Sequence, residues 1–108
     1  EGEHWISLFV NLKEKYIFFM DSNGVQPPKQ VRALVSEIKK QCRALGLNMQ
    51  VIYNKKQHQK KNTECGIYSL FTIINLLNGQ FTPKDLTSTR IPDEQMVELR
   101  NKYFNKHL

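Results

Sequence analysis

The stretch ECGIYSLFTIINLLN, residues 64–78, decides the fold of this chain. Its apolar side chains fall around nearly the whole circumference of a helix, which predicts a helix that is buried on most sides. Thr63 or Asn62 can serve as its N-cap, and Asn78-Gly79 is a helix stop signal. We therefore expect a central helix that the rest of the domain surrounds.

The segments around this helix predict a small mixed sheet and further helices. Two aromatic-rich runs predict an antiparallel hairpin, and a short apolar run predicts a third strand. Apolar residues at steps of three and four predict one amphipathic helix before the third strand and another near the C-terminus. The order β-β-α-β-α-α is typical of an α+β domain. The expected ranges are 5–12 and 15–21 for the hairpin, 28–45 for the first helix, 48–53 for the strand, 54–62 for a polar loop and 92–105 for the last helix.

The composition fits one small domain over residues 1–108, with 40% hydrophobic and 24% charged residues. No apolar run approaches the roughly 18 residues that span a bilayer, so we expect no membrane partner. Two cysteines are too few for a disulfide framework and predict a reducing compartment. Three histidines without a Cys-x-x-Cys pair predict no metal site, and we expect no cofactor. Because the chain begins at Glu1 without Met, we expect a piece of a longer protein.

The net charge of +6 is concentrated in one segment, at Lys55, Lys56, Lys60 and Lys61. The favoured interpretation is a solvated basic loop. The other, which stays open, is a contact for nucleic acid or another acidic surface.

Cys65 is the candidate nucleophile. It lies in the first turn of the expected central helix, where backbone N–H groups and the positive end of the helix dipole favour the thiolate. Gly66 leaves room for a substrate backbone to approach the sulfur. Cys42 lies instead on the apolar stripe of the 28–45 helix, which fits the usual role of a buried cysteine as a small hydrophobe.

The hairpin register places His4 and Asp21 on one face of the sheet. With a two-residue turn at Lys13-Glu14, Asp21 pairs with Ile6 and lies diagonal to His4, whereas a three-residue turn would shift this parity. We expect the central helix to cover this more apolar face and to bring Cys65 close. In nucleophilic catalysis a thiolate attacks, an imidazole moves the proton and a carboxylate orients the imidazole.

These residues together resemble the signature of the adenain-like and SUMO-specific cysteine proteases. In that signature a His-Trp pair starts a strand, an acidic residue ends the next, and a Gln precedes a Cys-Gly at the head of a central helix. The resemblance covers essentially the whole chain, and the matching residues are His4-Trp5, Asp21, Gln59 and Glu64-Cys65-Gly66.

The resemblance implies a papain-like α+β core and a role for each residue. His4 is then the general base, Asp21 its orienting partner and Cys65 the nucleophile. Gln59 donates its side-chain amide to the oxyanion together with the Cys65 backbone N–H. Trp5 and Gly66 line the substrate cleft, and Trp5 walls it near the substrate's C-terminal residues, where a narrow slot suits glycine.

Two positions have rivals. Asn23 also lies on the His4 face, and some viral members of the family carry Asn as the orienting residue. Gln57 lies two residues from Gln59, and the loop register can favour either one. From the loop alone, Gln59 would be interpreted as a solvated amide.

Residues 62–79 and 90–104 look most like the maturation proteases of large DNA viruses and related mobile elements, which process capsid and core precursors at Gly-rich sites. We expect such an endopeptidase, in the host-cell cytoplasm, the viral factory or the virion. The alternatives are a cellular protease specific for SUMO or another ubiquitin-like protein, in the nucleus or cytoplasm, and a protein-binding module that does not cleave. Family members carry an N-terminal subdomain before the His-Trp strand, and we expect this chain to need it, or another chain, to complete its cleft.

Overall fold

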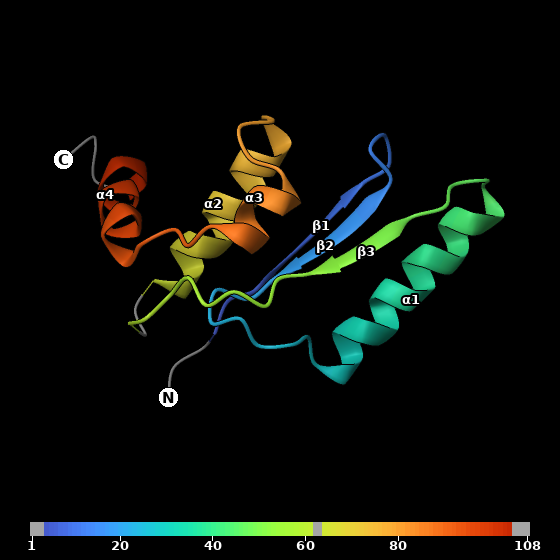
Figure 1. Ribbon diagram of the computed structural model, residues 1–108, viewed down its shortest axis with the longest axis horizontal. Helices are drawn as coiled ribbons and strands as arrows, with labels where there is room; N and C mark the ends of the chain where they lie inside the picture. The colour runs from blue at the N-terminus through green and yellow to red at the C-terminus, as the bar shows by residue number, and fades with distance from the viewer. Residues whose placement is uncertain (1–3, 62–63, 105–108) are drawn as a thin grey trace.

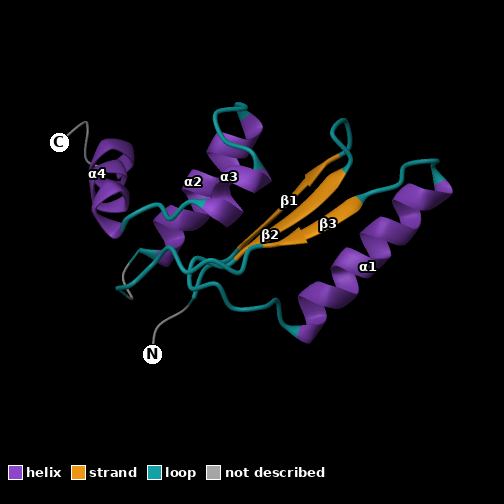
Figure 2. Cartoon of the chain, viewed as in Figure 1, coloured by secondary structure: helices purple, strands orange, loops and turns teal. Residues whose placement is uncertain are grey.

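In the computed structural model, which describes residues 4–61 and 64–104, a small sheet separates one long helix from the other helices (Figure 1 and Figure 2). The fold is α+β, as expected. Along the chain the elements are β1 (Ser7–Asn11), β2 (Tyr16–Met20), α1 (Lys29–Ala44), β3 (Gln50–Tyr53), α2 (Cys65–Leu77), α3 (Pro83–Ser88) and α4 (Asp93–Phe104).

The sheet is mixed, with β2 between an antiparallel β1 and a parallel β3. The β1–β2 register runs from Ser7 opposite Met20 to Asn11 opposite Tyr16, which confirms the expected pairing. The strands stop earlier than expected, so residues 12–15 form the connection in place of a two-residue turn. Because this loop also contains an even number of residues, the alternation of side chains along both strands is preserved.

The helix that covers each face of the sheet differs from the expectation. α1 covers the face of Leu8 and Ile17, whereas α2 packs on the opposite face, against Phe18 and Met20. The expectation that the central helix covers the face of Leu8 and Ile17 is therefore wrong. β2 is the middle strand, and Ile17 and Phe18 on its two faces are both fully buried. Since both faces of such a strand are apolar, apolarity alone does not tell which helix covers which face.

The core beneath α1 contains Cys42, as its place on the apolar stripe predicted. Cys42 is buried with Val35 and Met49 against Ile17, on the side of the sheet away from α2. It is a free thiol, and it fills space as a small hydrophobe.

α2 is buried on its sheet side and open on the other. Leu70 and Leu77 are 41% and 75% exposed, so the expected burial around most of the helix does not occur within the described residues. The N-cap position is Glu64, while Asn62 and Thr63 lie outside the described residues. At the other end the predicted stop is confirmed, because Asn78 is the C-cap and Gly79 has φ +77°.

The sequence interpretation missed α3, although its signals are present. Thr82 caps the helix in a reciprocal capping box with Asp85, and Pro83 occupies the first turn. α3 is short, and its buried Leu86 belongs to the core beneath α2. None of the helices in the described parts of the chain is both long enough and apolar enough to cross a membrane.

Candidate active site

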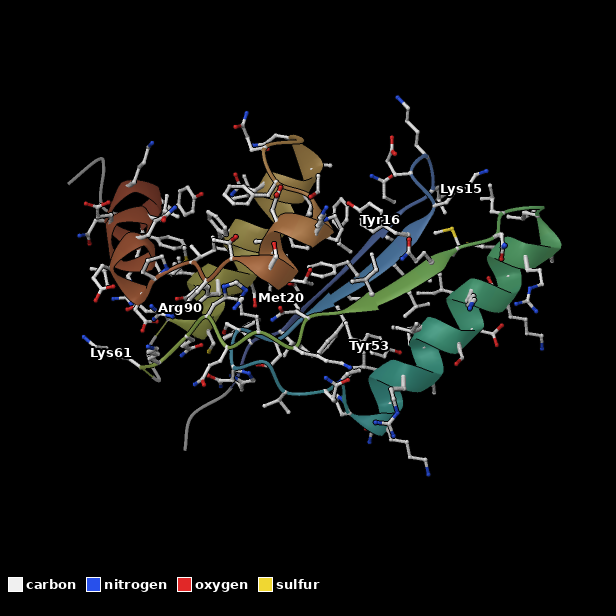
Figure 3. All side chains as sticks on the ribbon, in the orientation of Figure 1. Lys15, Tyr16, Met20, Tyr53, Lys61 and Arg90 are labelled. Carbon is white, nitrogen blue, oxygen red and sulfur yellow. The ribbon has the colours of Figure 1, made fainter. Side chains whose placement is uncertain are left out.

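The candidate residues lie around one end of the sheet, where β1 begins and β2 ends. Figure 3 marks this end by Met20, the last residue of β2, with Lys61 and Arg90 toward the same side, whereas Tyr16 marks the far end. His4 precedes β1, Asp21 follows β2, Gln59 lies in the loop after β3, and Cys65 is the first residue of α2.

His4 and Asp21 are in direct contact. The His4 Nε2 and the Asp21 Oδ1 atoms are 2.9 Å apart, and the carboxylate is almost fully buried. The Asn23 backbone N–H donates to the same Oδ1 at 2.8 Å, so the turn after β2 holds the carboxylate in place. Since Nε2 faces the carboxylate, Nδ1 is the ring nitrogen left to exchange a proton with a thiol. Of the two candidate orienting residues, Asp21 is the one hydrogen-bonded to His4, and Asn23 donates its backbone N–H to the same carboxylate.

Cys65 lies beside the His4 segment. Its thiol is buried, and the Trp5 backbone N–H donates to Sγ over 3.4 Å. His4 precedes β1, which begins at Ser7, and Asp21 follows β2, which ends at Met20. Because both residues lie outside the strands, the alternation of side chains in the sheet does not dictate where their side chains point. This explains how they can lie near Cys65 although α2 covers the opposite face from the one expected.

Trp5 and Gly66 lie beside Cys65, the candidate nucleophile. The Trp5 side chain is 58% exposed, and a Cβ atom on Gly66 would stand 3.5 Å from its ring. A Cβ at that distance is in ordinary van der Waals contact, so the Trp5 indole packs closely against the head of α2 at Gly66.

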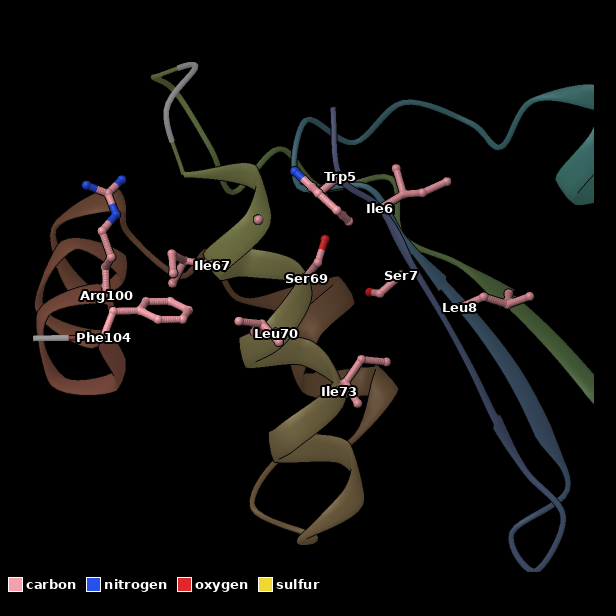
Figure 4. Close-up of a pocket in the computed structure, with 11 residues that line it drawn as sticks. Trp5, Ile6, Ser7, Leu8, Ile67, Ser69, Leu70, Ile73, Arg100 and Phe104 are labelled. Atoms are coloured by element: carbon pink, nitrogen blue, oxygen red, sulfur yellow. The ribbon is translucent and has the colours of Figure 1, made fainter. Parts of the chain in front are cut away.

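An apolar groove of about 660 Å³ begins at this point and runs between β1 and the open side of α2 (Figure 4). We call it the β1–α2 groove. It is lined by Trp5, Ile6, Ser7 and Leu8, by Gly66, Ile67, Ser69, Leu70 and Ile73 of α2, and by Arg100 and Phe104 of α4.

Gln59 is buried, in contrast to the solvated amide that the loop alone predicts. It is 1% exposed; its Oε1 accepts from the Ser22 hydroxyl at 2.6 Å, and its Nε2 donates to the Lys61 carbonyl. The rival Gln57 is exposed and donates to the Gln59 backbone carbonyl.

His58 is a structural residue that the sequence interpretation missed. It is fully buried; its Nδ1 accepts from the Ile91 N–H at 2.8 Å, and its Nε2 lies 2.7 Å from the Leu86 carbonyl. This pair of contacts selects the neutral tautomer that carries its proton on Nε2. Burial lowers the pKa of His58, and the charges of Lys56 and Arg90 lower it further, against the opposing effect of the Leu86 carbonyl.

Asp93 and Tyr68 tie the loop to the helices behind it. The buried Asp93 carboxylate accepts the backbone N–H groups of Lys60 and Lys61 through Oδ2, at 3.0 and 3.3 Å. The Tyr68 hydroxyl lies 3.1 Å from Asp93 Oδ1 and 2.7 Å from the Ile91 carbonyl. Burial and the adjacent carboxylate raise the pKa of Tyr68. No sequence motif indicated this network, because its members are scattered along the chain.

Glu64, the residue before Cys65, is also anchored. Glu64, 3% exposed, forms an ion pair with Arg100, which attaches α4 to the head of α2. Within residues 4–61 and 64–104, no cluster of three or more His, Cys, Asp or Glu side chains could hold a metal ion.

Comparison with known families matches residues 1–108 to the Ulp1 protease family, C-terminal catalytic domain. The chain belongs to the Ulp1 protease family. This agrees with the resemblance that the sequence motifs indicated.

Similar proteins come from large DNA viruses. R355 of Acanthamoeba polyphaga mimivirus, which is named as a thiol protease, is 32% identical over 95% of this chain and 34% of its own length. The SUMO-1 cysteine protease S273R of African swine fever virus, isolate Pig/Kenya/KEN-50/1950, is 34% identical over 95% of this chain and 38% of its own length. A crystal structure of the African swine fever virus pS273R protease superposes with a TM-score of 0.86 at 32% identity, covering 93% of this chain and 38% of that one. The chain thus spans about a third of the length of these relatives.

We expect His58 to make the fold acid-sensitive. Its pKa is lowered in the folded state, so below about pH 6.5 the unfolded chain binds a proton that the folded chain does not. The stabilisation from neutral His58 is complete above that pH and is lost as the pH falls toward the folded-state pKa, by up to about 1.4 kcal/mol per pH unit. In urea unfolding, His58→Gln should be less stable at neutral pH but lose less stability between about pH 6.5 and 5. Parallel pH profiles for the two proteins would contradict this.

Proposed function

We propose that the protein is a cysteine endopeptidase that cleaves through an acyl-enzyme. The observation that carries the proposal is the 2.9 Å contact of His4 with Asp21, next to a buried thiol at the head of α2. The family supports the same chemistry.

The contacts support the following sequence of steps. His4 removes the Cys65 proton through Nδ1, and the resulting His4 imidazolium stays paired with Asp21. The Cys65 thiolate then attacks the scissile carbonyl carbon. The Gln59 amide and the Cys65 N–H donate to the oxyanion. When the carbon–nitrogen bond breaks, His4 returns the proton to the leaving amine. A water molecule, deprotonated by His4, then attacks the thioester, releases the new carboxyl end and restores the thiol.

The space near the nucleophile favours glycine in the substrate. The Trp5 indole packs close to Gly66, which leaves little room beside Cys65 for a branched side chain of the substrate. Because the relatives are viral, we propose that the substrates are capsid or core precursors with Gly-rich sites, processed in the cytoplasm, viral factory or virion of an infected cell. A SUMO-like substrate is the alternative, in line with the name of the African swine fever virus relative.

A protein-binding module that does not cleave is a less favoured hypothesis than an endopeptidase. A degenerate copy would be expected to lose at least one member of the set, yet this chain has His4, Asp21, Gln59 and Cys65. Hydrogen bonds also link His4 to Asp21, Trp5 to Cys65 and Ser22 to Gln59.

Covalent labelling tests the nucleophile. A glycine-based peptide vinyl sulfone should modify Cys65 and spare Cys42, because Cys42 is buried under α1 away from the histidine. His4→Ala should abolish labelling, and Cys42→Ala should leave it unchanged, both checked by mass mapping. Equal modification of the two thiols would count against the mechanism.

We propose further that an N-terminal subdomain or another chain completes the substrate cleft. The β1–α2 groove is apolar and open, and Leu70 and Phe104 along it are 41% and 61% exposed. The chain also spans about a third of its relatives.

Residues 1–108 alone should therefore turn over a Gly-Gly-X peptide far more slowly than the longer protein, while iodoacetamide still alkylates Cys65. A comparison of the two proteins by release of a fluorescent leaving group measures this. Equal turnover would refute the need for a further segment.

Besides the protein substrate, we propose that the chain binds nucleic acid through the loop after β3. Lys55, Lys60 and Lys61 are exposed there, Lys56 is half-buried, and the chain carries a net charge of +6. Phosphate contacts release counterions, so such binding is steeply salt-dependent.

The affinity for a DNA duplex should fall steeply between about 50 and 200 mM salt. The double variant Lys55→Gln, Lys61→Gln should weaken binding and flatten this dependence. Lys29→Gln with Lys40→Gln, which removes the same charge from exposed positions on α1, should not. An affinity that does not respond to salt in fluorescence anisotropy would exclude the proposal.

A further inference from the structure

We infer that Ser22 is a positioning residue for the oxyanion donor: its hydroxyl holds the Gln59 amide in the orientation that presents an N–H to the reaction. The inference rests on the proposed function. Ser22 follows Asp21 directly, so one segment at the end of β2 would serve both the histidine and the oxyanion donor.

The side-chain amide of glutamine has two ends of nearly the same shape, and only hydrogen-bond partners distinguish them. Here the Ser22 hydroxyl donates to Oε1 at 2.6 Å, and Nε2 donates to the Lys61 carbonyl. If the amide turned over, its oxygen would face the Lys61 carbonyl, placing two acceptors together. An amide nitrogen carries two hydrogens, so the Lys61 contact uses one and leaves the other for a developing oxyanion.

Burial makes these contacts decisive. Ser22 and Gln59 are 2% and 1% exposed, so bulk water has little access to replace the hydroxyl as a donor to Oε1. The second contact is itself held in place, because the Lys61 N–H binds the buried Asp93 carboxylate. The amide therefore has a fixed partner at each end.

The backbone of Ser22 holds the same loop through separate contacts. Its carbonyl accepts the N–H groups of His58 and Gln59 at 2.8 and 2.9 Å. Close by, a Cβ atom on Gly24 would stand 2.8 Å from the Lys55 carbonyl, so the turn and the loop are in tight contact. Ser22→Ala removes the hydroxyl and keeps the backbone contacts. The loop should stay in place while Oε1 loses its donor, so that the Lys61 carbonyl remains as the single anchor of the amide.

Kinetics of the full-length protein test the inference. Losing an oxyanion donor typically lowers the rate by roughly 10²–10³. We expect Gln59→Ala to lower kcat by that amount and Ser22→Ala to lower it roughly 10- to 100-fold, with KM changed by less than about twofold. Ser22→Ala added to Gln59→Ala should cost no more than about a further twofold, because the amide that it positions is gone.

Thr72→Val is the matched control. Thr72 is 1% exposed, and its hydroxyl donates to the Tyr68 carbonyl within α2, so this change also deletes a buried hydroxyl. Its kcat should stay near that of the wild type. Each kcat is expressed per mole of Cys65 titrated by the peptide vinyl sulfone, which adds to a carbon–carbon double bond and forms no oxyanion. This normalisation removes any difference in folded fraction.

The outcomes separate the inference from the proposed function. If the wild-type protein neither cleaves peptides nor titrates at Cys65, the proposed function fails. If the wild type is active and Ser22→Ala matches Thr72→Val per titrated site, the positioning role is overturned. A fully additive loss in the double variant, or a Ser22→Ala protein without titratable Cys65, would assign Ser22 to general folding and overturn it as well.

Discussion

Two consecutive residues at the end of β2 connect the parts of the candidate site. The Asp21 carboxylate contacts His4, and the Ser22 carbonyl accepts two backbone N–H groups from the loop that carries Gln59. Both residues follow the middle strand of the sheet, and that strand is fully buried at Ile17 and Phe18. The position of the site is therefore set by the most tightly packed element of the fold. Small displacements of β2 would move His4 and the loop that carries Gln59 together.

A second support holds the site from behind. Tyr68, Asp93 and His58 bring α2, the start of α4 and the loop after β3 to one buried set of hydrogen bonds. A half-satisfied network of this kind would be costly, because buried polar groups need partners. The loop after β3, which the sequence predicts to be a polar surface loop, is therefore held in place by buried hydrogen bonds. The side chains of Lys60 and Lys61 are exposed, while their backbone N–H groups bond to the buried Asp93 carboxylate.

The sequence predicted the hairpin register, the three helices α1, α2 and α4, and the α+β class, because each depends on local patterns. The register followed from an even-numbered connection, which the observed loop at 12–15 preserves. The face covered by α2 could not be predicted, since the middle strand is apolar on both sides. The burial of His58 and Gln59 could not be predicted either, because their neighbours in the chain are lysines and glutamines. The site roles came from the resemblance to the protease family, together with the place of Cys65 and the hairpin register, and they stay predictions that the observed contacts support.

The open side of α2 has a practical consequence for handling the chain. An exposed apolar surface lies beside β1, an edge strand of the sheet, and includes Trp5, Leu70 and Phe104. An edge strand next to an exposed apolar surface can pair with another copy of the chain, so this chain should be sparingly soluble and should aggregate when concentrated. Its high positive charge opposes that tendency in dilute salt and is screened as salt is added. Low-salt buffers and dilute samples are thus the favourable conditions for keeping the chain in solution.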